Sequence, residues 1–154
     1  MRRFELSSGE GQYPIHAAAM LIGEDLLVAI WGGTQPHIGA VSLAQPRPSL
    51  ADPERTSATA SVLARPGHKD DDVAKMVSEY LAASLAKNVV VTVGIHWDHL
   101  NQEAIEEIVA NCRELAEALS KGAKEQWSKE QGSNDPLRHC DLATYDIATL
   151  ESNG

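Results

Sequence analysis

The first half of the chain carries short apolar runs separated by turn-forming residues, a pattern typical of β-strands. A later run, 89–93, is unbroken and β-branched, which predicts a buried strand. Gly23-Glu24-Asp25 lies between the second and third runs and predicts a hairpin. The expected strands are residues 4–8, 13–22, 26–31, 37–44, 57–64 and 89–93.

Two later segments repeat apolar residues at helical spacing. They predict amphipathic helices over residues 70–86 and from 101 to about 120, the second with Asn101 as its N-cap. After Gly122 the periodicity fades. We therefore expect one domain over residues 1–120 and a polar C-terminal tail over 121–154, partly disordered or packed on a neighbouring subunit.

Composition and charge restrict the function classes. A chain of 154 residues with 43% hydrophobic content suits a single globular domain, and no apolar run approaches the ~18 residues of a membrane span. The net charge of −9 argues against nucleic acid as the main partner, because phosphate contacts need clustered Lys and Arg. Cys112 and Cys140 form no CxxC pair, and the N-terminus lacks a signal-peptide apolar region, so a cytoplasmic location is expected.

The segment 94–99, Gly-Ile-His-Trp-Asp-His, lies between the buried strand and the second helix. Loops at such junctions commonly carry ligand contacts. His96 and His99 could hold a divalent metal, but zinc needs three or four ligands, so His37, His68 or Asp98 would have to complete the site. The alternative interpretation is one hydrogen-bonded core histidine and one surface histidine.

The segment 31–37, Trp-Gly-Gly-Thr-Gln-Pro-His, is a second candidate. Gly32 and Gly33 allow a sharp turn that exposes N–H groups to an anion, although the spacing fits no P-loop. The alternative is a simple hairpin turn. Trp31 and Trp97 could each stack on a planar ring or simply belong to the core.

Arg47 and Arg65 stand next to prolines in an acidic chain, where a preset backbone would suit phosphate or carboxylate contacts. Ordinary surface arginines are the alternative. Residues 70–72 are all aspartate, which complements the dipole of the following helix and repels an added anion. The chain has no GxSxG or HExxH motif, and Cys112 falls on an apolar helical stripe that suits an unreactive thiol.

Four short motifs occur in order: GGTQPHIGAV at 32–41, QPRPSL at 45–50, PGHKDD at 66–71 and VTVGIHWD at 91–98. Together they resemble the LpdD-like family, small proteins associated with gallate-type decarboxylases, over roughly residues 4–119. The resemblance implies an α+β fold like that of the proteasome assembly chaperones, with two amphipathic helices packed on an antiparallel sheet, and a homo-oligomer. The residues that match by position are Gly32, Gly33, His37, Arg47, Arg65, His68, His96 and Asp98.

The resemblance further implies a chaperone for prenylated flavin mononucleotide (prenylated FMN), the cofactor of UbiD-type decarboxylases. We expect the protein to bind prenylated FMN, or FMN, and to deliver or mature it, with a UbiD-type decarboxylase and a flavin prenyltransferase as partners. Trp31 or Trp97 would serve the flavin ring, and Arg47, Arg65 and the Gly-Gly loop the phosphate. Two alternatives stay open: a small metal-dependent enzyme using His37, His96 and His99, and an assembly module that binds no cofactor.

Overall fold

The computed structural model describes residues 2–66 and 69–131. Every predicted strand and helix is present within these ranges. In chain order the elements are β1 (Arg2–Ser8), β2 (Ile15–Ile22), β3 (Asp25–Gly33), β4 (Ala40–Pro48), β5 (Thr56–Ala64), α1 (Asp70–Leu85), β6 (Val89–His96) and α2 (Gln102–Gln131).

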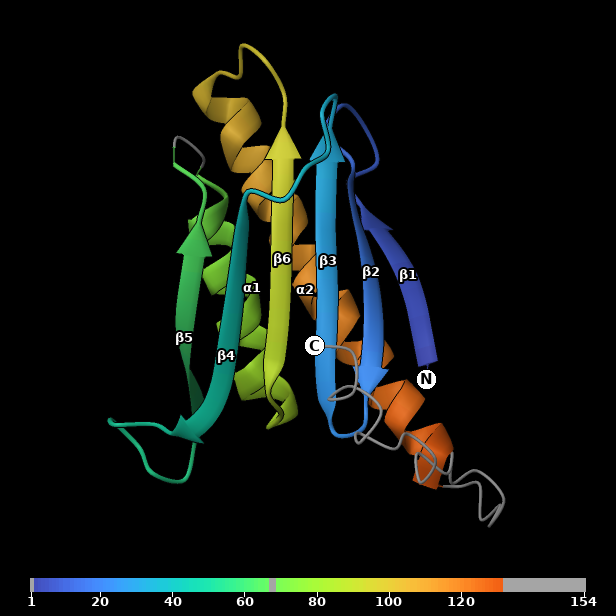
Figure 1. The fold of residues 1–154 in the computed structure, drawn as a ribbon, viewed down its shortest axis with the longest axis vertical. Coiled ribbons are helices and arrows are strands. Elements are labelled where there is room, and N and C mark those ends of the chain that lie inside the picture. The colour runs from blue at the N-terminus through green and yellow to red at the C-terminus, as the bar shows by residue number, and fades with distance from the viewer. Residues whose placement is uncertain (1, 67–68, 132–154) are drawn as a thin grey trace, which may run out of the picture.

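The six strands form one sheet in the order β1-β2-β3-β6-β4-β5 (Figure 1). The last strand in sequence, β6, therefore lies at the centre, where Val89, Val91 and Val93 are fully buried. Its β-branched run suits this position because the side chains pack on a pleated surface that lies under the helices. The α+β class expected from the sequence is confirmed.

The sheet is mixed, which corrects the expectation of a wholly antiparallel one. β6 pairs in parallel with β3, with Val28 opposite Val91, and in antiparallel with β4. The other neighbouring pairs are antiparallel. The physical reason is the crossover through α1, which returns the chain to the end where β3 and β5 begin, so that β6 runs in the same direction as both.

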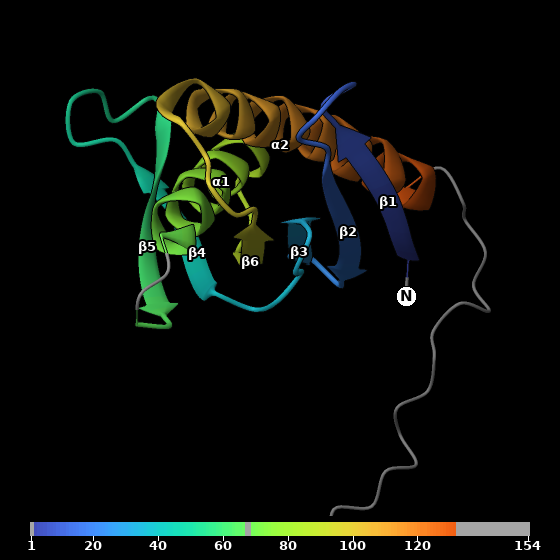
Figure 2. The same ribbon diagram turned by 90° about the horizontal axis from the view of Figure 1, so that it is seen from above.

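Both helices cover the same face of the sheet, as the view in Figure 2 shows. α1 packs against β4, β5 and β6, whereas α2 packs against β1, β2 and α1. The core between the layers is built from alternate strand residues and from one stripe of each helix, and Leu81, Leu115 and Leu119 are fully buried in it. No helix within the described ranges has the length and apolar character needed to cross a membrane.

The second helix runs well beyond its expected end near residue 120. The helical periodicity fades after Gly122 in the sequence, but this glycine lies against Phe4, and a Cβ at its position would be 2.8 Å from the Phe4 ring. Ala123 is fully buried, and the Trp127 indole N–H donates to the Gly23 carbonyl at 3.2 Å. The domain therefore continues to Gln131, and the predicted tail, where it runs from 132 to 154, lies outside the described residues.

The second face of the sheet, called the open face below, has no helix or strand of the described chain against it (Figure 2). Strand residues alternate between fully buried positions under the helices and partly exposed positions on the open face, as the β2 pattern from Ile15 to Ile22 illustrates. A sheet that is covered on one side only is a normal two-layer arrangement.

Candidate functional site

Three loops meet at the end of the sheet where β3, β5 and β6 finish. Backbone hydrogen bonds tie them together: the Thr34 N–H donates to the His96 carbonyl at 2.9 Å, the Gly39 N–H to the Val93 carbonyl at 2.8 Å, and the Arg65 N–H to the Gly39 carbonyl at 2.8 Å. The segments 34–39 and 97–101, together with Arg65 directly after β5, are therefore supported by the sheet edge beneath them.

Two glycines let the histidine-bearing segments approach closely. Gly33 has φ +93°, and a Cβ on it would collide with the His96 carbonyl. A Cβ on Gly94 would collide with the His37 carbonyl. Only glycine fits such contacts, so these positions bring the backbones of His37 and His96 together. The Thr34 N–H donates to the His96 carbonyl, so it is not one of the N–H groups of the Gly-Gly loop that could hold an anion.

His37 and His96 meet at this end, in agreement with the importance given to both segments in the sequence. Their ring centroids are 6.3 Å apart at an interplanar angle of 75°. His37 Nδ1 lies 3.0 Å from the Gln35 carbonyl and its Nε2 3.3 Å from Asp70 Oδ2, so both ring nitrogens face acceptors. His96 Nε2 lies 3.1 Å from Asp98 Oδ1. Such contacts orient the rings and support their use as donors.

Asp70 is the site residue that sequence reasoning missed. The aspartate run predicts a solvated first helical turn, but Asp70 is only 6% exposed and accepts a hydrogen bond from the Ile95 N–H at 3.1 Å. The helical spacing in the sequence could have identified it. Asp70 precedes Ala74 by four residues and Val77 by seven, and this spacing places Asp70 on the buried face of α1. The dipole interpretation does suit Asp72, which is exposed.

The positively charged candidates are divided between the two ends of the sheet. Arg65 and Lys69 are exposed at the histidine end, and His68 lies outside the described residues. Arg47 lies near the far end of β4, where its guanidinium donates to Thr59 Oγ1 at 2.6 Å. Because a strand rises about 3.3 Å per residue, Arg47 is roughly 20 Å from the start of β4. The structure therefore does not bring Arg47 to the other candidates.

The expected metal set is not assembled within residues 2–66 and 69–131. No three His, Cys, Asp or Glu side chains of these ranges are placed to hold one ion. His37 and His96 are neighbours, but His99 lies on an exposed turn with φ +56°. Of the three ligands proposed for a metal-dependent enzyme, His37 and His96 therefore lie side by side and His99 lies apart from them.

A cavity of about 460 Å³, here called the tryptophan cavity, opens at the carboxyl end of β3. Trp31 comes from the open face and Trp97 from the segment after β6. A Cβ on Gly32 would lie 3.2 Å from the Trp97 ring, so the glycine leaves room for the indole. Trp97 also packs edge-to-face on Tyr13, at 5.3 Å between centroids. The cavity is lined by Gly11, Gln12, Pro14, His16, Trp31, Gly32, Gly33, Thr34, Pro36 and Trp97.

A second cavity, of about 250 Å³, lies on the helix side of the same end. It is mostly aliphatic, with Val73 from α1, Ile95 from β6 and Ile108 from α2 among its walls. His96 and Asp70 also line it. His96 therefore lines the aliphatic cavity, and its backbone carbonyl lies against Gly33 and Thr34, which line the tryptophan cavity.

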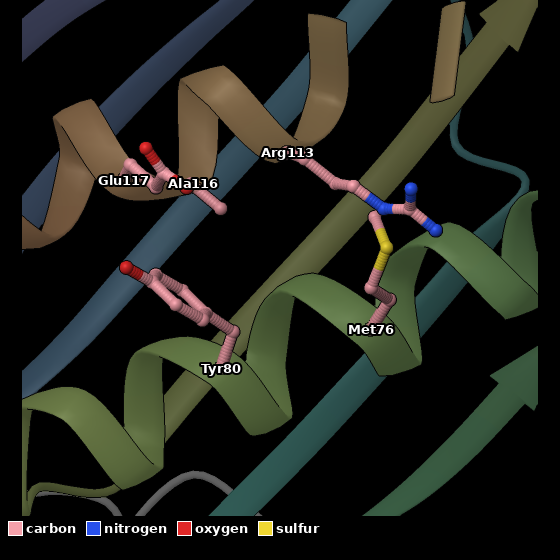
Figure 3. A pocket seen from close by; sticks show the side chains of 5 residues that line it. All are labelled: Met76, Tyr80, Arg113, Ala116 and Glu117. Atoms are coloured by element: carbon pink, nitrogen blue, oxygen red, sulfur yellow. The ribbon is translucent and has the colours of Figure 1, made fainter. Parts of the chain in front are cut away.

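A third hollow, of about 220 Å³, lies away from this end, between the two helices (Figure 3). Met76 and Tyr80 come from α1, and Arg113, Ala116 and Glu117 from α2. None of the residues predicted for the site lines it.

Cys112 is a packed thiol, as the sequence predicted. It is fully buried on α2, and burial, followed by the nearby charge of Asp70, raises its pKa from 9.0 to about 12. A thiol with so high a pKa is a poor nucleophile near neutral pH. Cys112 is therefore a core residue and not a catalytic one.

Comparison with known proteins gives a family. Residues 9–124 match the prenylated flavin chaperone LpdD-like domain. Protein LpdD of Lactiplantibacillus plantarum is 30% identical over 95 residues, which span 60% of this chain and 65% of that protein, a little under two thirds of its length. A solved chain from a chaperone complex for yeast 20S proteasome assembly covers 81% of this chain and 98% of its own length, with 15% identity and a TM-score of 0.49. The family match includes the histidine pair and both cavities beside it, and the chain belongs to the LpdD-like prenylated flavin chaperone family.

Proposed function

We propose that the protein binds prenylated FMN and delivers or matures it for a UbiD-type decarboxylase, after a flavin prenyltransferase has made it. The observation that carries this proposal is the family match over residues 9–124, because it includes every segment that meets at the histidine end of the sheet. The proposed role needs tight, reversible binding and no nucleophile of the chain's own.

The tryptophan cavity suits the flavin ring. Its volume of about 460 Å³ falls within the range of small-molecule pockets, which is roughly 300–1,000 Å³. Trp31 and Trp97 offer aromatic faces and edges on which a planar ring can pack. Gln12 and Thr34 line the cavity and are exposed to solvent, so the cofactor could enter and leave the cavity on their side.

The phosphate would lie across the sheet end from this cavity. Arg65 and Lys69 are the cationic side chains there, and three strand spacings separate β3 from β5, about 14 Å. His96 would lie between the two ends of such a ligand and would offer it one ring nitrogen, Nδ1, because its Nε2 lies 3.1 Å from Asp98 Oδ1. Both ring nitrogens of His37 already face acceptors of the chain, so His37 would support the site through its packing beside His96.

The residues of this chain would hold and shield the cofactor, whose own ring system supplies the decarboxylation chemistry in the client enzyme. Asp70 and Asp98 fix the orientations of His37 and His96. The second cavity places the aliphatic side chains of Val73, Ile95 and Ile108 close to His96. These are functions of binding and positioning.

The experiment is a titration of the purified protein with prenylated FMN, followed by flavin absorbance and by tryptophan fluorescence. We expect saturable binding that His96→Ala weakens. His99→Ala is the matched control, because His99 is exposed on the next turn and should leave the affinity unchanged. Absence of binding by the folded wild-type protein, or equal affinities of the two variants, would contradict the proposed site.

A further inference from the structure

The two edges of the sheet differ in how they are protected. β1 forms one edge, carries Arg2, Arg3 and Glu5, and lies against α2. β5 forms the other edge and has nine residues with no charged side chain and no proline (Figure 1). Its register with β4 runs through all of them without a bulge. Charged side chains, prolines and bulges are the features that usually stop an edge strand from pairing with another chain, so β1 is protected and β5 is not.

Every second residue of β5 turns its backbone hydrogen-bonding groups away from the sheet. The Arg65 N–H, directly after the strand, donates to the Gly39 carbonyl, so the odd-numbered residues pair with β4 and the even-numbered residues face outward. Pro46 fits this alternation, because it lies opposite Ala58 and has no N–H to donate to β5. The residues that face outward are Thr56, Ala58, Ala60, Val62 and Ala64. No strand of the described chain pairs with this outer edge, so these groups can pair with another polypeptide.

Another strand can approach this edge closely. Ala58, Ala60 and Ala64 carry only a methyl group, and Leu63 beside them is 79% exposed. An added strand would form main-chain hydrogen bonds with the outward-facing residues and would place one of its own side chains beside Leu63. This recognition mode is β-strand addition, in which the backbone gives the affinity and the side chains give the specificity.

Positive charge marks both ends of the edge. Arg55 directly precedes β5 and Arg65 directly follows it, and both side chains are exposed. They lie ten positions apart in a chain whose net charge is −9. Along an extended strand this separation is about 33 Å. A segment that pairs along the whole edge is therefore favoured when it carries a carboxylate near each end and no charge between them.

A second copy of β5 does not meet this condition. An antiparallel two-fold pair centred on Ala60 would place Arg55 of each copy opposite Arg65 of the other. Like charges directly opposite each other destabilise a strand pair. The charge pattern therefore favours a segment of a different protein over self-pairing of this edge.

We propose that the outer edge of β5 binds an extended segment of a partner protein as a seventh strand of the sheet. The segment has an uncharged centre and an acidic residue near each end. Because β5 finishes at the histidine end of the sheet, the added strand would bring the partner's chain next to that end. The inference stands on the edge itself and does not depend on which ligand the protein takes.

The first test is a fluorescence anisotropy titration of a dye-labelled peptide with the full chain. The peptide has nine alternating threonine and valine residues and one aspartate at each end. We expect saturable binding that Ala60→Pro weakens about tenfold, because proline removes an outward-facing N–H and puts its ring where the added strand would lie. Ser61→Ala is the matched control, because the Ser61 backbone faces β4, and its affinity should equal that of the wild type. Absence of binding by the folded wild-type protein overturns the proposal, whether or not flavin binds. Equal affinities of Ala60→Pro and Ser61→Ala also overturn it.

A charge exchange covers the case in which Ala60→Pro fails to fold. The second peptide has the same centre and a lysine at each end. The wild type should bind the aspartate peptide about fivefold more tightly than the lysine peptide, the size expected for exposed ion pairs. Arg55→Glu lies outside the strand on an exposed residue, and it should reduce this preference. Arg55 is chosen because Arg65 also belongs to the proposed phosphate site. Equal affinities of the wild type for the two peptides, or a preference that Arg55→Glu leaves unchanged, would overturn the proposal.

Discussion

Asp70 should contribute more to stability than either of the two aspartates that follow it. Its side chain is buried, accepts the Ile95 N–H at 3.1 Å and lies 3.3 Å from His37 Nε2. A hydrogen bond to a charged group contributes about 1.5–3 kcal/mol, and its loss would leave the Ile95 N–H without its acceptor. Asp70→Ala should therefore lower the free energy of unfolding by about 1.5–3 kcal/mol. For Asp72→Ala we expect about 0.3–1 kcal/mol, because exposed Asp72 contributes only through the helix dipole.

The assay is urea unfolding at one fixed protein concentration, followed by circular dichroism. Asp70→Asn separates the two contributions, because the amide keeps an acceptor for the Ile95 N–H and removes the charge beside His37. We expect its loss of stability to lie between those of Asp70→Ala and Asp72→Ala. Equal midpoints for Asp70→Ala and Asp72→Ala would refute the assignment of Asp70 to a buried structural role at the site.

Three further predictions concern the ligand and the core. Arg65→Ala should weaken flavin binding about tenfold, because a charge-assisted phosphate contact contributes at least about 1.5 kcal/mol. Arg47→Ala is the control, because Arg47 lies near the far end of β4 and its loss should leave the titration curve unchanged. Trp31→Ala should weaken binding measured by flavin absorbance, and Trp127→Phe, on the distant part of α2, should not. Cys112 should resist thiol labelling at pH 8 until the protein unfolds, as peptide mapping would show. Burial raises the Cys112 pKa from 9.0 to about 12, so between pH 9 and pH 12 the thiol ionises in the unfolded chain but not in the folded one. The wild type should therefore lose stability relative to Cys112→Ala as the pH rises from 9 to 12. A gain in stability over this pH range would contradict the assignment of Cys112 to the core.

The elements of the fold could be predicted from local patterns, but the pairing of the strands could not. The β-branched run at 89–93 identifies a buried strand wherever it sits in the sheet. Its insertion between β3 and β4, parallel to β3, depends on the path of α1 over the sheet, which no local pattern encodes. The end of α2 was missed for a similar reason. The helical periodicity fades after Gly122 in the sequence, whereas the contact of Gly122 with Phe4 of β1 comes from a strand more than a hundred residues away in the chain.

The candidate site also combines residues that local sequence patterns identify with residues that only the fold identifies. His37 and His96 could be proposed because each adjoins a strand end and a glycine, and glycines allow close backbone approach. Asp70 was hidden within a run of three aspartates, of which only the first points into the protein. Arg47 and Arg65 look alike beside their prolines, and only the direction of β4 and β5 sends them to opposite ends of the sheet.

The central claim is that the histidine end of the sheet holds prenylated FMN. Native mass spectrometry of the protein co-expressed with a flavin prenyltransferase, and purified without a nickel column, reports bound cofactor, bound metal and subunit number in one spectrum. We predict an oligomer that carries prenylated FMN in the wild type and loses it in His96→Ala while the subunit number is kept. A wild-type protein that carries no flavin after co-expression, or a His96→Ala protein that carries as much as the wild type, would contradict the claim.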